Sequence, residues 1–218
     1  MLFAEPTRYR AGLTLYGDYI DFSSLHSTVH QLADQIPLAG HFEEFMLGFA
    51  YELRKAYQGE REVKEFGDDG IDKVTYFGCK LLWPFYLVHV GMLRWAAAFN
   101  PTTKAIQANL FLLEAATEDA LTRSDSKIGR ECAQWLAGFR GLPTNYLLQF
   151  IDDICLDYVS IQRPGKERFA TLPRMLRSIS SYSKEYAAFR DRLEHISKFQ
   201  KCRPDDLVSR AEWPDFKW

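Results

Sequence analysis

Two histidines near the N-terminus have a type and spacing that could serve metal chemistry. His26 and His30 are four positions apart, so on an α-helix they lie about 40° apart on one face. Two imidazoles in this arrangement can hold one transition metal when a third ligand comes from elsewhere in the chain. No Glu-x-x-His pattern accompanies them, and the apolar Leu25, Val29 and Leu32 occupy the neighbouring face. We therefore expect both histidines to border the core, with a metal site as the alternative and no cofactor predicted.

Arg190 and His195 form a second pair, in the pattern Arg-x4-His. This short motif resembles the catalytic pattern of HEPN-type ribonucleases, which are also helical. The resemblance implies RNA cleavage without metal, in which His195 serves as acid and base and Arg190 holds the phosphate. A step of five residues places the two side chains about 140° apart on an ideal helix, so a common site needs a kink or a second helix. A surface pair of Asp191 with His195 is the structural interpretation, and we favour it.

A third group of candidates is acidic. Asp153 and Asp157 share one face of a predicted helix, beside Asp152, and aspartates placed in this way can hold Mg²⁺ against a diphosphate. The pattern is faintly similar to the aspartate motif of isoprenoid synthases. Those enzymes use a second acidic motif on a facing helix, for which Glu114 and Glu118 are the candidates here. We expect the aspartates to lie on a solvent-exposed face instead.

The elements that must position these residues are predicted to be helices. Apolar residues recur at intervals of three and four along most of the chain, which predicts a mainly α fold. We expect a single helical-bundle-like domain of about seven helices over residues 1–203, with a small N-terminal β-hairpin at about 11–22 around Gly17-Asp18. Residues 61–70 have turn chemistry and are expected to form a polar loop.

Two C-terminal segments have distinct expectations. The apolar spacing over residues 173–201 is close to a heptad repeat, so we expect one long helix that packs against a partner helix or a second copy. The tail, residues 204–218, ends in the aromatic sequence WPDFKW and is expected to fold back onto the helical domain.

Charge is distributed unevenly although the net charge is only −2. Residues 1–159 carry 14 basic and 21 acidic side chains, whereas residues 160–218 carry 13 basic and 8 acidic side chains. Arg174, Arg177 and Lys184 belong to the basic segment and are candidate binding residues for an anionic partner. The structural alternative, which we favour, is that this segment lies against the acidic part of its own chain or of a sister subunit.

The composition excludes several classes of protein. An apolar fraction of 47% is far too high for a disordered chain. The four cysteines stand singly, which fits reduced thiols and predicts a cytoplasmic protein without disulfides. The first residues lack the pattern of a signal peptide. Leu81–Phe99 is apolar enough to suggest a membrane span, but Pro84, His89 and Arg94 interrupt it, so we expect a buried helix and no membrane partner.

Two N-terminal motifs are similar to a family of uncharacterised bacterial proteins. They are YGDYIDF, at residues 16–22, and LRKAYQGEREV, at residues 53–63. The resemblance covers roughly the first half of the chain and implies no activity, but it singles out Asp18, Asp21, Arg54, Arg61 and Glu62 as candidate binding residues. The two aspartates could cap the first helix or accept bidentate pairs from the arginines. A polar connection between hairpin and helices is favoured over a ligand pocket.

The expected function is therefore that of a non-catalytic binding or assembly protein. It would self-associate through the helix at 173–201 and present a basic C-terminal face to an anionic or protein partner. The alternative is a HEPN-like ribonuclease or toxin that acts on RNA through Arg190 and His195, and whether the protein is an enzyme stays open.

Overall fold

The computed structural model describes residues 1–34, 41–66, 73–139, 146–161, 163–207 and 213–218. Within these residues the fold is mainly helical with one small antiparallel sheet, which confirms the predicted fold class. The eight α-helices of the described chain are α1 (Tyr19–Ala33), α2 (His41–Tyr57), α3 (Trp83–Ala97), α4 (Lys104–Ser124), α5 (Ser126–Ala137), α6 (Leu147–Val159), α7 (Lys166–Ser178) and α8 (Lys184–Gln200), and a short 3-10 helix, η1 (Pro204–Asp206), follows them.

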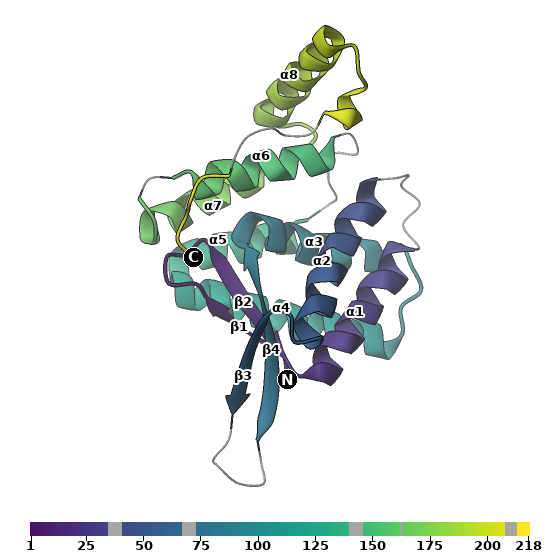
Figure 1. The fold of residues 1–218 in the computed structure, drawn as a ribbon, viewed down its shortest axis with the longest axis vertical. Coiled ribbons are helices and arrows are strands. Elements are labelled where there is room, and N and C mark those ends of the chain that lie inside the picture. The colour runs from purple at the N-terminus through teal and green to yellow at the C-terminus, as the bar shows by residue number, and fades with distance from the viewer. Residues whose placement is uncertain (35–40, 67–72, 140–145, 162, 208–212) are drawn as a thin grey trace.

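The sheet contains the strands β1 (Phe3–Pro6), β2 (Gly12–Gly17), β3 (Glu62–Phe66) and β4 (Val74–Leu82), in the order β1-β2-β4-β3. β2 pairs with both β1 and β4, and all of its residues are buried. Figure 1 shows α1 and α2 together on one side of this sheet. The hairpin predicted at about 11–22 is wrong in position: the strands that form it are β1 and β2, and Tyr19, Ile20 and Phe22 belong to α1.

Helix α1 begins immediately after β2 because two aspartates cap its first turn. The Asp18 carboxylate accepts a hydrogen bond from the backbone N–H of Asp21 at 2.8 Å, and the Asp21 carboxylate accepts one from the N–H of Asp18 at 3.0 Å. This reciprocal capping box satisfies backbone donors that the helix itself cannot use. Of the two roles predicted for these aspartates, the structure shows the cap.

Replacing Asp18 with alanine is expected to lower the free energy of unfolding by about 1 kcal/mol, because the backbone donor of Asp21 loses its acceptor. Asp18→Asn keeps a side-chain oxygen at the same place and is expected to cost only a few tenths of that amount. Urea denaturation of the two variants and the wild type measures the difference. Equal stabilities of the Ala and Asn variants would contradict the capping role.

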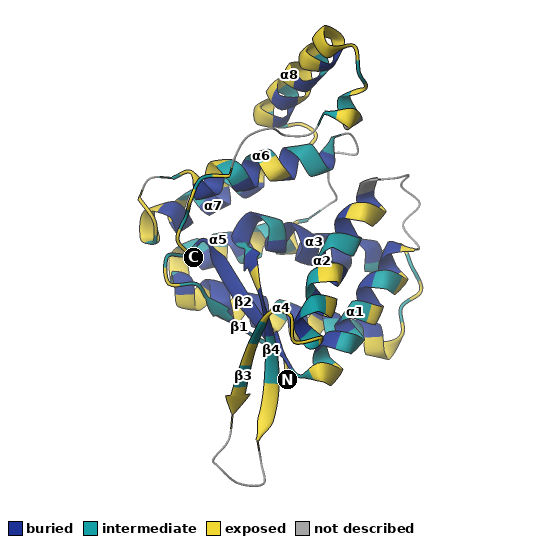
Figure 2. Ribbon diagram, in the orientation of Figure 1, coloured by how far each residue is buried: buried dark blue, intermediate teal, exposed yellow. Residues whose placement is uncertain are grey.

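The polar segment expected to be a loop at 61–70 contains a strand. β3 pairs with β4 from Glu62 opposite Gly78 to Phe66 opposite Val74, while residues 67–70 lie outside the described part of the chain. Both strands are largely exposed where they extend from the body (Figure 2). Charged side chains tolerate this exposure, and Lys64 pairs with Glu5 at 2.6 Å. The prediction failed because an exposed edge strand has few apolar residues to mark its period.

The central helix predicted from Leu81–Phe99 is confirmed as α3. It follows β4 directly, has Pro84 in its first turn and is buried on most sides, with Trp83, Tyr86 and His89 fully inaccessible to solvent. No helix of the described residues is both long and apolar enough to cross a membrane.

The long helix predicted for 173–201 is wrong, because α7 and α8 are separate helices. Pro173 lies inside α7 rather than at its start, and the chain leaves the helix after Ser178. The hydroxyl of Ser183 donates to the carbonyl of Ser178 at 2.6 Å and accepts from the N–H of Tyr186 at 3.0 Å, which caps α8. The Ser183 hydroxyl thus bonds to a backbone group of each helix at their junction and so favours a break.

The described end of the C-terminal tail contacts the helical domain. The backbone N–H of Tyr9 donates to the carbonyl of Trp218 at 2.9 Å, and the buried Arg168 donates to the carbonyl of Lys217 at 3.2 Å. Arg168 also donates to the carbonyl of Val159 at 3.1 Å, so one side chain joins α6, α7 and the tail.

Candidate functional site

A groove of about 520 Å³ lies between α6, α7 and α8 and brings together several of the predicted site residues. Helix α8 forms one wall and projects beyond α6 and α7 at one end of the molecule (Figure 1). It is held by a single buried row, Tyr186, Phe189 and Leu193, of which the first two pack on Phe150 at ring distances of 5.3 and 5.0 Å. Phe189 of this row also lines the groove.

Charges of both signs line the groove. Arg192 donates to the Asp153 carboxylate at 2.9 Å, which links α8 to α6. Arg174, on α7, has no charged partner among the described residues. Desolvation in the groove and the neighbouring Asp153 raise the pKa of Asp157, while Arg192 lowers it. With Glu185 included, the lining carries three acidic and two basic side chains, so it is not a basic face.

The other predicted basic residues are partly matched by acidic neighbours. Arg177 lies 3.8 Å from the Glu131 carboxylate on α5, which is the type of internal match that we favoured for this segment. Arg163 pairs with Glu167 on the surface. Lys184 is exposed at the first turn of α8. Such surface pairs contribute little to stability, but they reduce the positive potential available to a polyanion.

Arg190 and His195 both lie on exposed parts of α8. The Arg190 guanidinium donates to the Asp191 carboxylate at 2.9 and 3.2 Å and lies 4.0 Å from Glu194. The hydrogen bond to Asp191 raises the pKa of Arg190. α8 is continuous through both residues, so nothing in its backbone brings the two side chains to one face.

The acidic residues considered as two halves of a magnesium site lie apart. Asp153 and Asp157 line the groove beside α8, whereas Glu114 and Glu118 line a different pocket between α3, α4 and α5. The described residues contain no group of three or more His, Cys, Asp or Glu side chains arranged to hold a metal.

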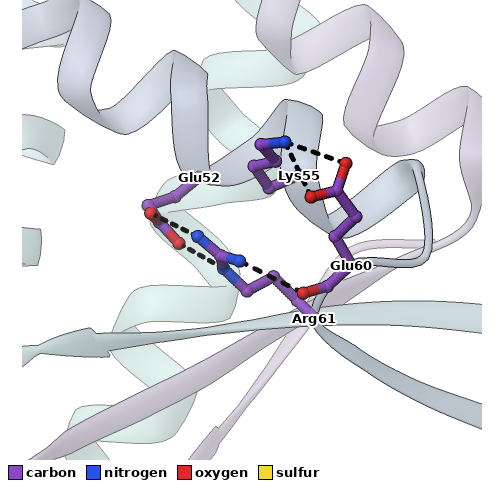
Figure 3. A network of polar contacts seen from close by, with 4 residues as sticks. All are labelled: Glu52, Lys55, Glu60 and Arg61. Carbon is purple, nitrogen blue, oxygen red and sulfur yellow. Dashed lines mark hydrogen bonds and ion pairs between the residues drawn. The ribbon is translucent and has the colours of Figure 1, made fainter.

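Arg61 belongs to a polar network that joins the end of α2 to the start of β3 (Figure 3). Its Nε and Nη2 donate to the Glu52 carboxylate at 2.8 and 3.0 Å, and Nη1 donates to the carbonyl of Glu60 at 3.1 Å. Lys55 donates to both carboxylate oxygens of Glu60, at 2.8 and 2.7 Å. The hydrogen bond from Lys55 lowers the pKa of Glu60, and the one to Glu52 raises that of Arg61. These contacts connect helix and sheet.

The remaining N-terminal candidates have separate partners. Glu62 accepts a hydrogen bond from the Tyr16 hydroxyl at 2.8 Å and pairs with Lys80. The Arg54 guanidinium lies 5.4 Å from the centre of the Tyr51 ring. Neither Glu62 nor Arg54 contacts the capping aspartates of α1. These contacts therefore fit a polar connection between the hairpin and the helices, which we favoured from the sequence, better than a shared ligand pocket.

His26 and His30 share one face of α1, with ring centres 4.5 Å apart. Partial burial, His30 and Arg54 lower the pKa of His26, in that order of importance. The edge of Tyr57 packs on His26 at 5.9 Å, which places this ring at the border of the core.

The residues of the groove that sequence reasoning missed include several apolar side chains and the charged Glu185 and Arg192. Phe150, Met175 and Phe189 line it beside the charged groups. Their spacing predicts burial in helices but does not show which helices meet. Only the break between α7 and α8, which turns the last helix away, creates the groove.

Comparison with known proteins gives one match. A family model described as a domain of unknown function, DUF6904, matches residues 2–218, nearly the whole chain. No curated protein and no solved structure matches the chain significantly. The chain belongs to the DUF6904 family, whose model covers the helical domain, the groove and the tail.

Proposed function

We propose that the protein is a non-catalytic binding protein that associates with a second copy of itself through the groove beside α8. The observation that carries this proposal is the row of side chains along the open face of α8. Ala188 and Arg192 line the groove, and Ile196 and Phe199 continue the same face at helical spacing toward the projecting end. Phe199 is 85% exposed. An exposed aromatic side chain on the helix face that borders a groove is typical of an interaction surface.

A second copy is the favoured partner because the surface can complement itself. A twofold interface places the same patch on both subunits, so its charges must be mutually compatible. Arg174 and Arg192 of one subunit can face Asp157 and Glu185 of the other. A patch of one sign would repel its own copy, and a polyanion such as RNA would meet the three acidic side chains of the lining.

Replacing Phe199 with glutamate is expected to raise the dissociation constant of the dimer at least about tenfold, because a large aromatic contact is lost and a charge is placed in the interface. Light scattering after size exclusion, over a series of protein concentrations, measures the mass. Tyr182→Glu is the matched control, because Tyr182 is 98% exposed but precedes α8 and lies outside the row. A wild-type monomer at all concentrations would refute the proposal, and so would equal effects of the two substitutions.

A further inference from the structure

A second pocket, of about 620 Å³, lies between α3, α4 and α5 and is separate from the groove beside α8. Pockets that bind small organic molecules typically have volumes of about 300–1,000 Å³, with mainly apolar walls and few polar groups. Four aromatic side chains contribute to the walls here: Trp95, Phe99, Phe111 and Phe139. The size and the lining therefore suit a small molecule with an aromatic ring.

The base of the aromatic wall is built by close packing. A Cβ atom at Gly91 would lie 2.8 Å from the Phe139 ring, so glycine alone lets this ring lie directly against α3. Trp135 packs on the edge of Phe139 at 5.2 Å, and Trp95 on Phe99 at 5.0 Å. The rings are thus held in place before any ligand arrives, which reduces the entropy cost of binding.

Among the described lining residues Arg94 is the cation, and each of its three guanidinium nitrogens already donates to a neighbouring side chain. Nε and Nη2 each donate to the Glu114 carboxylate at 2.6 Å, and Nη1 donates to Gln107 at 2.9 Å. The guanidinium also lies 4.8 Å from the centre of the Phe111 ring. Glu114 neutralises the charge of Arg94, and the hydrogen bonds fix the orientation of its guanidinium. This planar group therefore forms part of the pocket wall and is not a binding site for an anion.

Glu118 is the second carboxylate of the lining, and Arg94 does not neutralise it. It lies one helical turn after Glu114 on α4 and lines the same pocket, and no cation among the described residues pairs with it. Among the described residues the charged lining therefore consists of two carboxylates and one guanidinium. A ligand that compensates this charge must carry a positive group near Glu118.

Phe99 and Phe111 contribute to the lining although they are 63% and 62% exposed. Solvent contact with two large aromatic rings is unfavourable, and a flat apolar ligand between them would remove part of this exposure. We propose that the pocket binds a small aromatic amine, with the ring against Phe99 and Phe111 and the ammonium group on Glu118.

Calorimetry and ligand-observed NMR with three indole probes test the assignment. Tryptamine carries the ammonium group, tryptophol replaces it with a hydroxyl, and indole-3-propionate carries a carboxylate. We expect tryptamine to bind with a Kd of about 1 mM, the affinity typical of a ligand of this size. Tryptophol should bind about fivefold more weakly, and the carboxylate more weakly still.

Two variants and one control variant locate the site. Glu118→Gln should abolish the preference for the amine over the alcohol, whereas Asp119→Asn, at a neighbouring residue outside the lining that pairs with Arg123, should preserve it. Ala133→Trp fills the pocket from the partly exposed side of α5 and should remove binding of all three probes. Absence of tryptamine binding, equal affinity for the three probes, or binding that survives Ala133→Trp would each overturn the proposal. Since none of these residues lines the groove beside α8, the outcome is independent of self-association.

Discussion

Substituting Gly12 with alanine is expected to lower the free energy of unfolding by about 3 kcal/mol or more. A Cβ atom at this position would lie 1.9 Å from the backbone carbonyl oxygen of Leu81, on the paired strand β4. No rotation of a side chain relieves a clash with backbone, so β2 and β4 must separate. The strain would extend to α3, because the N–H of Trp83 donates to the carbonyl of the adjacent Ala11 at 3.1 Å.

Gly48→Ala is the matched control for this experiment. Gly48 lies within α2, and the nearest atom to a Cβ there is Cζ of Phe85, at an ordinary contact distance of 3.9 Å. Alanine is the better helix former, so this variant should gain about 0.5–1 kcal/mol. Chemical denaturation of both variants gives the two changes in the free energy of unfolding. Similar values for Gly12→Ala and Gly48→Ala would show that the close approach of β2 and β4 is not rigid.

The second large effect is a loss of stability in acid that depends on His89. This residue is completely buried in α3, and its ring stacks on Phe45 at 3.9 Å. Both ring nitrogens lie 2.8 Å from backbone carbonyl oxygens, Nδ1 from Phe85 and Nε2 from Phe45. Burial lowers the pKa of His89 to about 4, although the two carbonyls favour the charged ring and offset part of the shift.

The sign of the effect follows from proton binding. Between the ordinary pKa of 6.5 and the folded value of about 4, the unfolded chain binds the proton and the folded chain does not. His89 therefore imposes no penalty above about pH 6.5, and its contribution falls by about 3 kcal/mol as the pH decreases toward 4.

Urea denaturation near pH 7 and near pH 4.5 measures this loss. His89→Gln should be less stable than the wild type near pH 7 but should lose less stability between the two pH values, because glutamine does not titrate. His195→Gln, which makes the same substitution at an exposed position of α8, is the matched control. If His89→Gln loses as much stability in acid as the wild type, other groups cause the effect.

The helices were the predictable part of the fold because most of them have one apolar face directed to a common core. In α4, for example, Leu110, Leu113 and Leu121 recur at helical spacing and all are buried. Pro84 marked the first turn of α3, since proline is tolerated best where no intrahelical N–H is needed.

The sheet was only partly predictable because its strands have different environments. β2 is buried on both faces, and its apolar residues made it recognisable. β3 has the sequence EVKEF and is mostly exposed, so nothing in its polarity distinguishes it from a loop. Its strand conformation depends on pairing with β4, a contact that spacing along β3 does not encode.

The candidate sites were also only partly predictable. Contacts between residues close in the sequence could be predicted, whereas contacts between distant residues could not. The capping role of Asp18 and Asp21 was predictable because it depends on neighbours three residues apart. The ion pair of Arg192 with Asp153 joins residues that are distant in the sequence, and the excess of basic residues in the C-terminal segment gave no sign of it. The heptad-like spacing continued through Ile179 and Tyr182, but Tyr182 is exposed at the break between α7 and α8.

In the dimer that we propose, the return of the tail to the body affects how quickly subunits can exchange. Helix α8 is tied to the rest of the chain on its N-terminal side by the short serine-rich connection and on its C-terminal side by the contacts of Lys217 and Trp218. A dimer built by swapping α8 between copies would have to break both attachments and would form slowly. Docking of two intact surfaces breaks neither, so mixed dimers of two labelled preparations should equilibrate at the rate of simple dissociation.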